Sequence, residues 1–263
     1  MNNPYPITRG VKVLLIANVA VFFVQLLPGI GERLTGAAAL IPFNTFYEGQ
    51  VWRLATYMFL HSTGMVFHLL LNMFALWMFG GVLEERWGTK KFIGLYAMFG
   101  ATAALFGALY LFDVRLRFVP VVGASGAVFG LLTSYALYYP NRDVLLFFVL
   151  PVRAWIMVAG FAVLSLLMAF SHEDGIAHLV HLGGIAAAFI YLKGGPVLAA
   201  WRRDRRELRN ERETRRRAEE LAGRKKHYEE KVDPLLEKIS REGMGALTKE
   251  EIAMLKNVWR NRQ

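Results

Sequence analysis

One serine stands among small residues in the apolar stretch VVGASGAVFGLL, residues 121–132. A serine hydroxyl is a weak nucleophile until a base within hydrogen-bond reach takes its proton. His178 and His181 lie in a second apolar stretch, and either imidazole could be that base. Ser125 is therefore either a residue that packs two helices together or a nucleophile for acyl transfer.

The glycines favour His181 as the base. Gly126 and Gly130 follow Ser125, and Gly184 lies three residues after His181. Small residues at such spacing let two membrane helices approach closely, which would bring the hydroxyl and the imidazole together. Ser125 also begins its expected helix, where unpaired backbone N–H groups favour a developing negative charge. The structural alternatives are a serine that only packs or caps its helix and a histidine that only bridges helices.

His68 and Asn72 are a second pair of polar residues in an apolar segment. They are four residues apart, so they share one helix face and could donate hydrogen bonds to a substrate oxyanion. Bridging neighbouring helices is their structural alternative. At about 1.5 Å per residue, His68, Ser125 and His181 lie roughly 18–24 Å from the inner ends of their segments. This common depth predicts one polar site that opens to the outer face of the membrane.

The elements that must position these residues are six apolar segments. A helix needs about 20 apolar residues to cross the hydrocarbon core, and some of these segments are shorter. The excess of Lys and Arg on one side predicts cytoplasmic N- and C-termini. We therefore expect an all-α, multi-pass protein of the cell membrane, with spans near residues 11–28, 64–83, 91–112, 125–139, 154–170 and 178–192.

The rest of the chain divides by composition. The net charge is +10, and +7 of it falls in residues 193–263. We predict a membrane domain over 1–192, a charged cytoplasmic helix over 193–230 that could touch anionic lipids, and a small amphipathic helical tail over 231–263. Within the tail, Thr248 and Glu251 have the spacing of a capping box.

Two connecting segments are expected to lie at the membrane interface. The loop over residues 29–63 is rich in Phe, Tyr, Trp and Leu, which is typical of an interfacial segment. The stretch VLLFFVLPV, residues 144–152, is interpreted as an apolar lead-in to the fifth span.

Five stretches in this order resemble the rhomboid intramembrane serine proteases of bacterial type with six spans. They are VWRLATYMFLHS (51–62), HLLLN (68–72), GGVLEERWG (80–88), GASG (123–126) and HLVHLGG (178–184). The resemblance implies a six-helix rhomboid-like bundle in which Ser125 is the nucleophile and His181 the general base. His68 and Asn72 would line the oxyanion hole.

The resemblance also implies roles for the remaining motif residues. Arg53 and Glu84 would support the structure, as would Gly126, Gly184 and Phe129. Phe129 stands where many relatives have a tyrosine that stacks on the catalytic histidine. The first outer loop would be a membrane-immersed lateral element, and residues 170–177 a cap over the site. Substrates would be single-span membrane proteins.

Two other classes compete with a protease. A non-catalytic rhomboid-like module would bind or route membrane proteins, although it would be expected to have lost the serine or the histidine. A metal-dependent enzyme or transporter would use His61, His68, His178 and His181, but the chain has no H-E-x-x-H motif and no cysteine. We expect no cofactor, no metal ion and no nucleic-acid partner; the expected partners are transmembrane substrates and membrane lipids.

Overall fold

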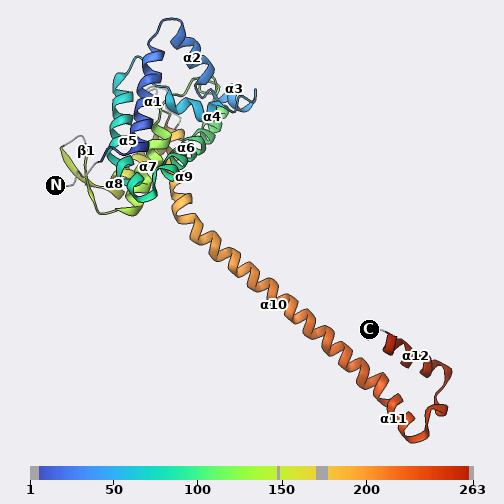
Figure 1. Cartoon of the computed structure of the whole chain (residues 1–263). Helices are drawn as coiled ribbons and strands as arrows, with labels where there is room; N and C mark the ends of the chain where they lie inside the picture. Colours follow the sequence, from blue (N-terminus) through green and yellow to red (C-terminus); the bar gives the residue numbers. More distant parts are fainter. Residues whose placement is uncertain (1–5, 147–148, 170–176, 261–263) are drawn as a thin grey trace. The chain divides into compact units, whose positions relative to one another are not determined.

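The computed structural model describes residues 6–146, 149–169 and 177–260, and these residues are mostly helical (Figure 1). The chain divides into two compact units, Met1–Gly195 and Pro196–Gln263. Each unit is described by itself below.

Each of the six apolar segments contains a helix. Helices α5 and α6, the latter extended by η2, are long and apolar enough to cross a membrane, and α8 is a shorter apolar helix. That all six cross the membrane stays a prediction. The helices are α1 (Arg9–Gln25), α5 (Val66–Trp87), α6 (Thr89–Phe106) with η2 (Gly107–Phe112), α7 (Ser125–Tyr138), α8 (Ala154–Leu167) and α9 (His178–Phe189) with η3 (Ile190–Gly194).

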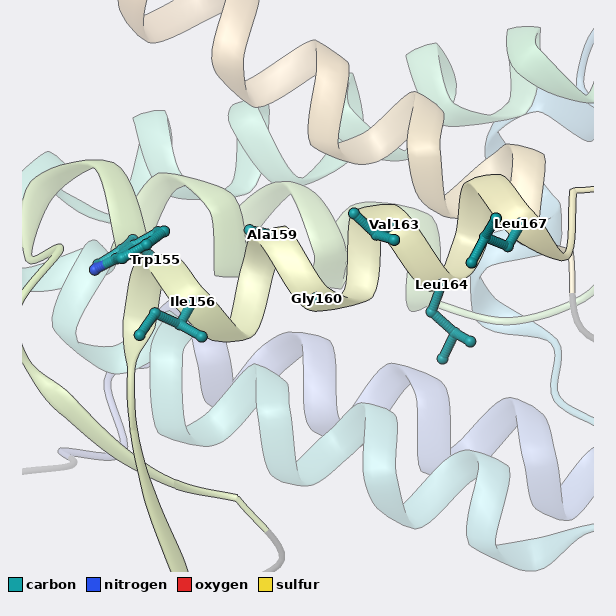
Figure 2. A pocket seen from close by; sticks show the side chains of 7 residues that line it. All are labelled: Trp155, Ile156, Ala159, Gly160, Val163, Leu164 and Leu167. Carbon is teal, nitrogen blue, oxygen red and sulfur yellow. The ribbon is translucent and has the colours of Figure 1, made fainter.

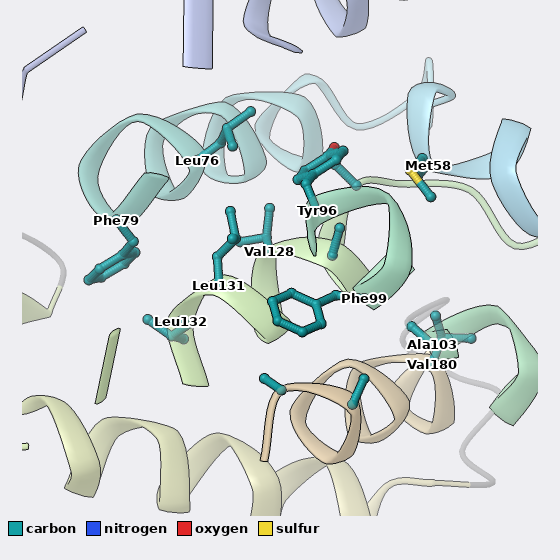
Figure 3. Close-up of a cluster of buried hydrophobic side chains, with 14 of the residues drawn as sticks. Met58, Leu76, Phe79, Tyr96, Phe99, Ala103, Val128, Leu131, Leu132 and Val180 are labelled. Carbon is teal, nitrogen blue, oxygen red and sulfur yellow. The ribbon is translucent and has the colours of Figure 1, made fainter. Parts of the chain in front are cut away.

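Helix α7 is the centre of the first unit and contacts α5, α6, α8 and α9. Almost all of its residues from Gly126 to Ala136 are buried, and Figure 3 shows Val128 and Leu131 among side chains of the neighbouring helices. Lipid is as apolar as these side chains, so close packing holds membrane helices together more than exclusion of water does. Small changes in side-chain volume along α7 are therefore expected to matter.

The loop between α1 and α5 folds into four short helical segments. They are α2 (Ile30–Ala38), α3 (Pro42–Phe46), α4 (Arg53–Thr56) and η1 (Tyr57–Phe59). The buried Arg53 donates hydrogen bonds to the carbonyls of Gly36 (2.7 Å) and Ala39 (2.6 Å). The next residue, Leu40, exchanges two backbone hydrogen bonds with Val121, of 3.0 and 2.8 Å. This loop thus fixes the segment that enters α7.

A small β-hairpin departs from the all-helical prediction. Strands β1 (Asp143–Leu146) and β2 (Leu150–Arg153) pair antiparallel, with Asp143 opposite Arg153. Val144 is buried while its neighbour Leu145 is exposed, which is the alternation of a strand. Pro151 has no N–H to donate to a helix, and an edge strand tolerates it. The hairpin replaces the simple lead-in expected over residues 144–152.

The outer face of α8 is apolar and exposed. It carries a shallow recess of about 420 Å³ that α8 alone lines (Figure 2). Exposed apolar patches of this kind mark contact with membrane or with another apolar partner. The lining residues are Trp155, Ile156, Ala159, Gly160, Val163, Leu164 and Leu167.

Glu84 joins three helices at one end of the bundle. Its carboxylate accepts hydrogen bonds from the backbone N–H groups of Gly10 (2.7 Å) and Val11 (2.8 Å), in the first turn of α1. It also accepts from the hydroxyls of Thr8 (2.5 Å) and Thr89 (2.6 Å), the latter at the start of α6. A buried carboxylate is tolerated when it is hydrogen-bonded in this way, and the positive end of α1 favours it further.

The second unit contains one long helix and a pair of short ones. They are α10 (Gly195–His227), followed by η4 (Tyr228–Val232), α11 (Asp233–Glu242), η5 (Met244–Ala246) and α12 (Lys249–Arg260). The predicted capping box is confirmed: Thr248 N–H donates to the Glu251 carboxylate (2.7 Å), and Glu251 N–H donates to the Thr248 hydroxyl (3.2 Å). Lys238 reaches Glu251 at 3.1 Å and links α11 to α12.

Glu84→Ala is expected to lower the free energy of unfolding by about 3 kcal/mol or more, because each buried donor left unsatisfied costs about 1–3 kcal/mol. Thermal unfolding of the full chain in detergent measures the change. The matched control is Glu85→Ala, whose exposed side chain is expected to matter by less than about 0.5 kcal/mol. Equal shifts for the two variants would contradict the role assigned to Glu84.

Candidate active site

Ser125 and His181 meet at the interface of α7 and α9. His181 Nε2 lies 2.8 Å from Ser125 Oγ, within the range expected of a nucleophile and its general base. Helix α7 begins at Ser125, its N-cap is Ala124, and no side chain caps the helix through a hydrogen bond. The hydroxyl is therefore paired with the imidazole and does not cap the helix. The catalytic roles of both residues stay predictions.

Glycines set the separation of α7 and α9. A Cβ added to Gly184 would lie 2.0 Å from the carbonyl oxygen of Gly126, which no real structure tolerates. A Cβ on Gly126 would lie 2.7 Å from both Ala103 Cβ and Tyr57 Oη. Close-packed interiors leave no room for such atoms. The backbones thus approach as the glycine pattern predicted, and this approach allows the 2.8 Å contact between Ser125 and His181.

Aromatic rings orient the imidazole of His181. The ring of Phe129, one turn after Ser125, stacks on it with centroids 4.4 Å apart and planes inclined by 25°. Phe129 in turn meets Phe161 of α8 edge to face at 5.6 Å. His178 lies edge-on to His181 at 6.0 Å and is buried, whereas His181 is partly exposed. Partial exposure suits a base that must exchange protons with substrate and water.

His68 lies beside the serine, over the backbone of Gly123. A Cβ on Gly123 would be 2.8 Å from His68 Nε2 and 3.6 Å from Ser125 Oγ. Gly123 has φ +129°, a conformation that other residues rarely adopt. Asn72 donates from Nδ2 to the carbonyl of His68 at 2.8 Å, so one of its N–H groups is engaged within α5. The structure thus brings His68 to the candidate nucleophile, while Asn72 supports the same helix turn.

His61 is a neighbour of the site that sequence reasoning considered only as a metal ligand. Its ring lies edge-on to His68 with centroids 5.3 Å apart, and it is buried. Burial, together with the smaller effect of the adjacent His68, lowers the pKa of His61 to about 4, so the ring is neutral at neutral pH. The sequence offered one signal that His61 lies near the site: it belongs to FLHS (59–62), the end of the first of the five rhomboid-like stretches. Among the described residues, no group of three His, Asp or Glu side chains is arranged to hold a metal ion.

The remaining motif residues lie away from the dyad. Glu84 is sixteen residues after His68 on α5, or about 24 Å along the helix at 1.5 Å per residue. Arg53 fixes the first loop through Gly36 and Ala39. The segment 170–177, expected to cover the site, lies outside the described residues except for Ala177.

A protein-family model described as the Rhomboid domain matches residues 48–194, more than half of the chain. The chain belongs to the rhomboid family. This membership and the apolar helices identify a membrane protein. A second model, a family of unknown function called DUF6576, matches residues 219–258 in the second unit.

Curated relatives carry rhomboid names. The chain is 33% identical over 126 residues to Rhomboid protein 1, mitochondrial, of Saccharomyces cerevisiae (47% of this chain, 36% of the relative). It is 32% identical over 166 residues to Rhomboid-like protease 1 of Toxoplasma gondii (58% and 52%). It is 26% identical over 196 residues to Rhomboid protease AarA of Providencia stuartii (65% and 66%). The matched region thus spans between about a third and two thirds of each of these relatives.

Gly184→Ala is expected to destabilise the protein by about 1–3 kcal/mol or more, because its methyl group would collide with the Gly126 carbonyl. Thermal unfolding in detergent measures the effect. Gly160→Ala on α8 is the matched control: nothing lies within 4 Å of the added Cβ, and alanine favours a helix by about 1 kcal/mol. The two changes should therefore have opposite signs. Shifts in the same direction would contradict a tight α7–α9 contact.

Proposed function

We propose that this chain is an intramembrane serine endopeptidase that cleaves single-span membrane proteins through a Ser125–His181 dyad. The observation that carries the proposal is the 2.8 Å contact between Ser125 Oγ and His181 Nε2 on two helices of a rhomboid-family protein. Relatives named as rhomboid proteases from Toxoplasma gondii and Providencia stuartii support it.

The first half of the reaction forms an acyl-enzyme. His181 Nε2 takes the proton of Ser125, and Oγ attacks the carbonyl carbon of the scissile peptide bond. The oxyanion that forms lies at the start of α7, where the N–H of Ser125 and side-chain donors from His68 and Asn72 stabilise it. His181 then gives its proton to the leaving amine as the C–N bond breaks.

The second half hydrolyses the acyl-enzyme. His181 takes a proton from water, whose oxygen attacks the acyl carbon, and then returns a proton to Ser125 as the ester bond breaks. A dyad has no carboxylate to orient its imidazole. In this protein the ring of Phe129 takes over that orienting role. The support for this role is that the ring stacks on His181 with centroids 4.4 Å apart.

The proposal includes the setting of the enzyme. The chain is of the bacterial type, with six spans in the cell membrane and both termini in the cytoplasm. The excess of Lys and Arg in segments that would be cytoplasmic supports this orientation. Its partners are transmembrane protein substrates and membrane lipids. The membrane domain covers residues 1–192, the charged cytoplasmic helix 193–230 and the helical tail 231–263.

The alternative is a rhomboid-like module that binds or routes membrane proteins without cutting them. Such a protein has no need of a serine and a histidine in hydrogen-bond contact, so the dyad geometry favours the protease. Binding of a single-span protein that is never cleaved, with no labelling of Ser125 by a serine-directed probe, would support the alternative.

Ser125→Ala and His181→Ala are each expected to reduce cleavage of a single-span reporter by about 10³-fold or more, because members of a catalytic unit act together. Cleavage is measured with purified protein in detergent, and labelling by a fluorophosphonate probe is measured in parallel. Ser134→Ala is the matched control, since its hydroxyl donates to the Gly130 carbonyl of its own helix. Cleavage by Ser125→Ala at the wild-type rate would refute the proposal.

A comparison of the membrane proteomes of cells that carry the wild-type protein and cells that carry Ser125→Ala would identify the natural substrates.

Phe129→Leu is expected to lower kcat about threefold to tenfold, because a stacked pair contributes about 0.5–1.5 kcal/mol beyond its burial. Phe129→Tyr keeps the ring and should keep the rate. The pH dependence of cleavage separates orientation from simple loss of stability, because only a displaced or differently solvated imidazole changes the pH profile. Equal rates for the leucine and tyrosine variants would contradict an orienting role for the ring.

A further inference from the structure

Helix α10 carries its charges on two separate faces. At about 100° per residue, six exposed arginines fall within an arc of about 140°, and the acidic residues Asp204, Glu207 and Glu211 gather on the opposite side. Glu213 is the one acidic residue of the segment 204–217 inside the arginine arc. The arginine stripe consists of Arg205, Arg206, Arg209, Arg212, Arg216 and Arg217.

Most of this arrangement works against the stability of the helix, although Glu213 lies four residues from both Arg209 and Arg217, the spacing of a stabilising pair. Arg205 and Arg209 are four residues apart, as are Arg212 and Arg216, and like charges at this spacing destabilise a helix. Farther along, opposite charges occupy the stabilising spacing, as in the pair Arg215–Glu219 at 2.9 Å. Among the described residues, no arginine of the stripe forms an ion pair. An external polyanion would remove the cost of placing these charges together.

The position of α10 in the chain favours the membrane surface as this polyanion. The helix continues the chain directly from α9 and η3, so a lipid surface beside α9 is present at high effective concentration. Trp201 is half exposed, and the guanidinium of Arg205 lies 4.1 Å from the centroid of its ring. Tryptophan prefers the level of lipid headgroups. The stripe carries no row of apolar side chains, which indicates binding to headgroups without insertion among acyl chains.

The segment before the stripe can bend. The π-helical turn η3 ends at Gly194, and Gly195 and Pro196 follow it at the division between the two compact units. Glycine, proline and π-turns are the usual sites of helix kinks. Such a kink would allow α10 to lie along a lipid surface.

We propose that the arginine stripe of α10 binds the phosphate groups of anionic lipids, with the acidic face of the helix turned to water. Guanidinium groups match phosphate oxygens with two parallel hydrogen bonds, and each basic side chain near an anionic surface increases binding about fivefold. This inference does not rest on the proposed proteolysis, because it involves neither Ser125 nor His181.

The test measures energy transfer from α10 to lipid headgroups in nanodiscs that hold one full-length chain each. The chain has no cysteine, so Asn210→Cys provides a single labelling site for the donor fluorophore. The acceptor is carried on headgroups in discs of phosphatidylcholine alone or of phosphatidylcholine mixed with phosphatidylglycerol. Two variants with the same loss of charge are compared. The stripe variant changes Arg205, Arg209, Arg212 and Arg216 to Gln, and the control variant changes Arg203, Arg215, Lys225 and Lys226 to Gln.

Strong transfer is expected only in discs with phosphatidylglycerol, and it should fall as salt rises to 1 M, where the Debye length is about 3 Å. The stripe variant should lose the energy transfer, and the control variant should keep most of it. Far-UV circular dichroism should show equal helix content in the two variants, because glutamine is a good helix former. Equal losses of energy transfer in both variants would show that binding depends only on the net charge of the helix and not on the stripe, which would overturn the proposal. Equal transfer in both kinds of disc would overturn it as well. If an equimolar short single-stranded RNA abolishes the transfer, the stripe is a nucleic-acid site and the lipid assignment is wrong.

Discussion

The contact between the backbones of α7 and α9 at Gly126 and Gly184 is the constraint on which the candidate site depends. A single added methyl group at Gly184 would fall 2.0 Å from the Gly126 carbonyl oxygen. Only at this separation do side chains as short as serine and histidine meet across the interface at 2.8 Å. Packing and reactivity are therefore not competing interpretations of the sequence GASG. The glycines pack the helices, and the packing brings the imidazole of His181 to the hydroxyl of Ser125.

A second constraint acts on the segment before the serine. Val121 pairs with Leu40 of the first loop, and the N–H of Gly123 donates to the carbonyl of Tyr57 at 3.1 Å. Arg53 holds the same loop from its other side, through the carbonyl of Ala39. The start of α7 is thus fixed from outside the helix, so the N–H groups at its first turn have a defined direction. An oxyanion site needs donors held in place before the charge develops.

The sequence predicted the parts of this arrangement that depend on residue type and spacing. The segments containing the helices, the glycines of α7 and α9 and the choice of His181 followed from small and polar residues in apolar stretches. The hairpin of residues 143–153 was missed because VLLFFVLPV has no clear alternation, and strand pairing depends on a partner segment. The position of His68 over Gly123 could not be predicted from the sequence either. It depends on a positive φ and on loop packing that no local pattern encodes.

Hydrogen bonding separates the structural polar residues of this protein from the candidate reactive ones. Glu84 uses both carboxylate oxygens on four donors, and Gln25 bonds the backbone of His61 through its oxygen (2.8 Å) and its nitrogen (3.1 Å). Both side chains are buried. Ser125 and His181 are partly exposed, they meet each other at 2.8 Å, and the imidazole stacks on the ring of Phe129. A fully bonded polar group gains nothing from a substrate, whereas a hydroxyl held by one weak base can exchange that contact for a bond to carbon. Burial in a membrane protein therefore indicates chemistry only where the polar group is left with capacity to react.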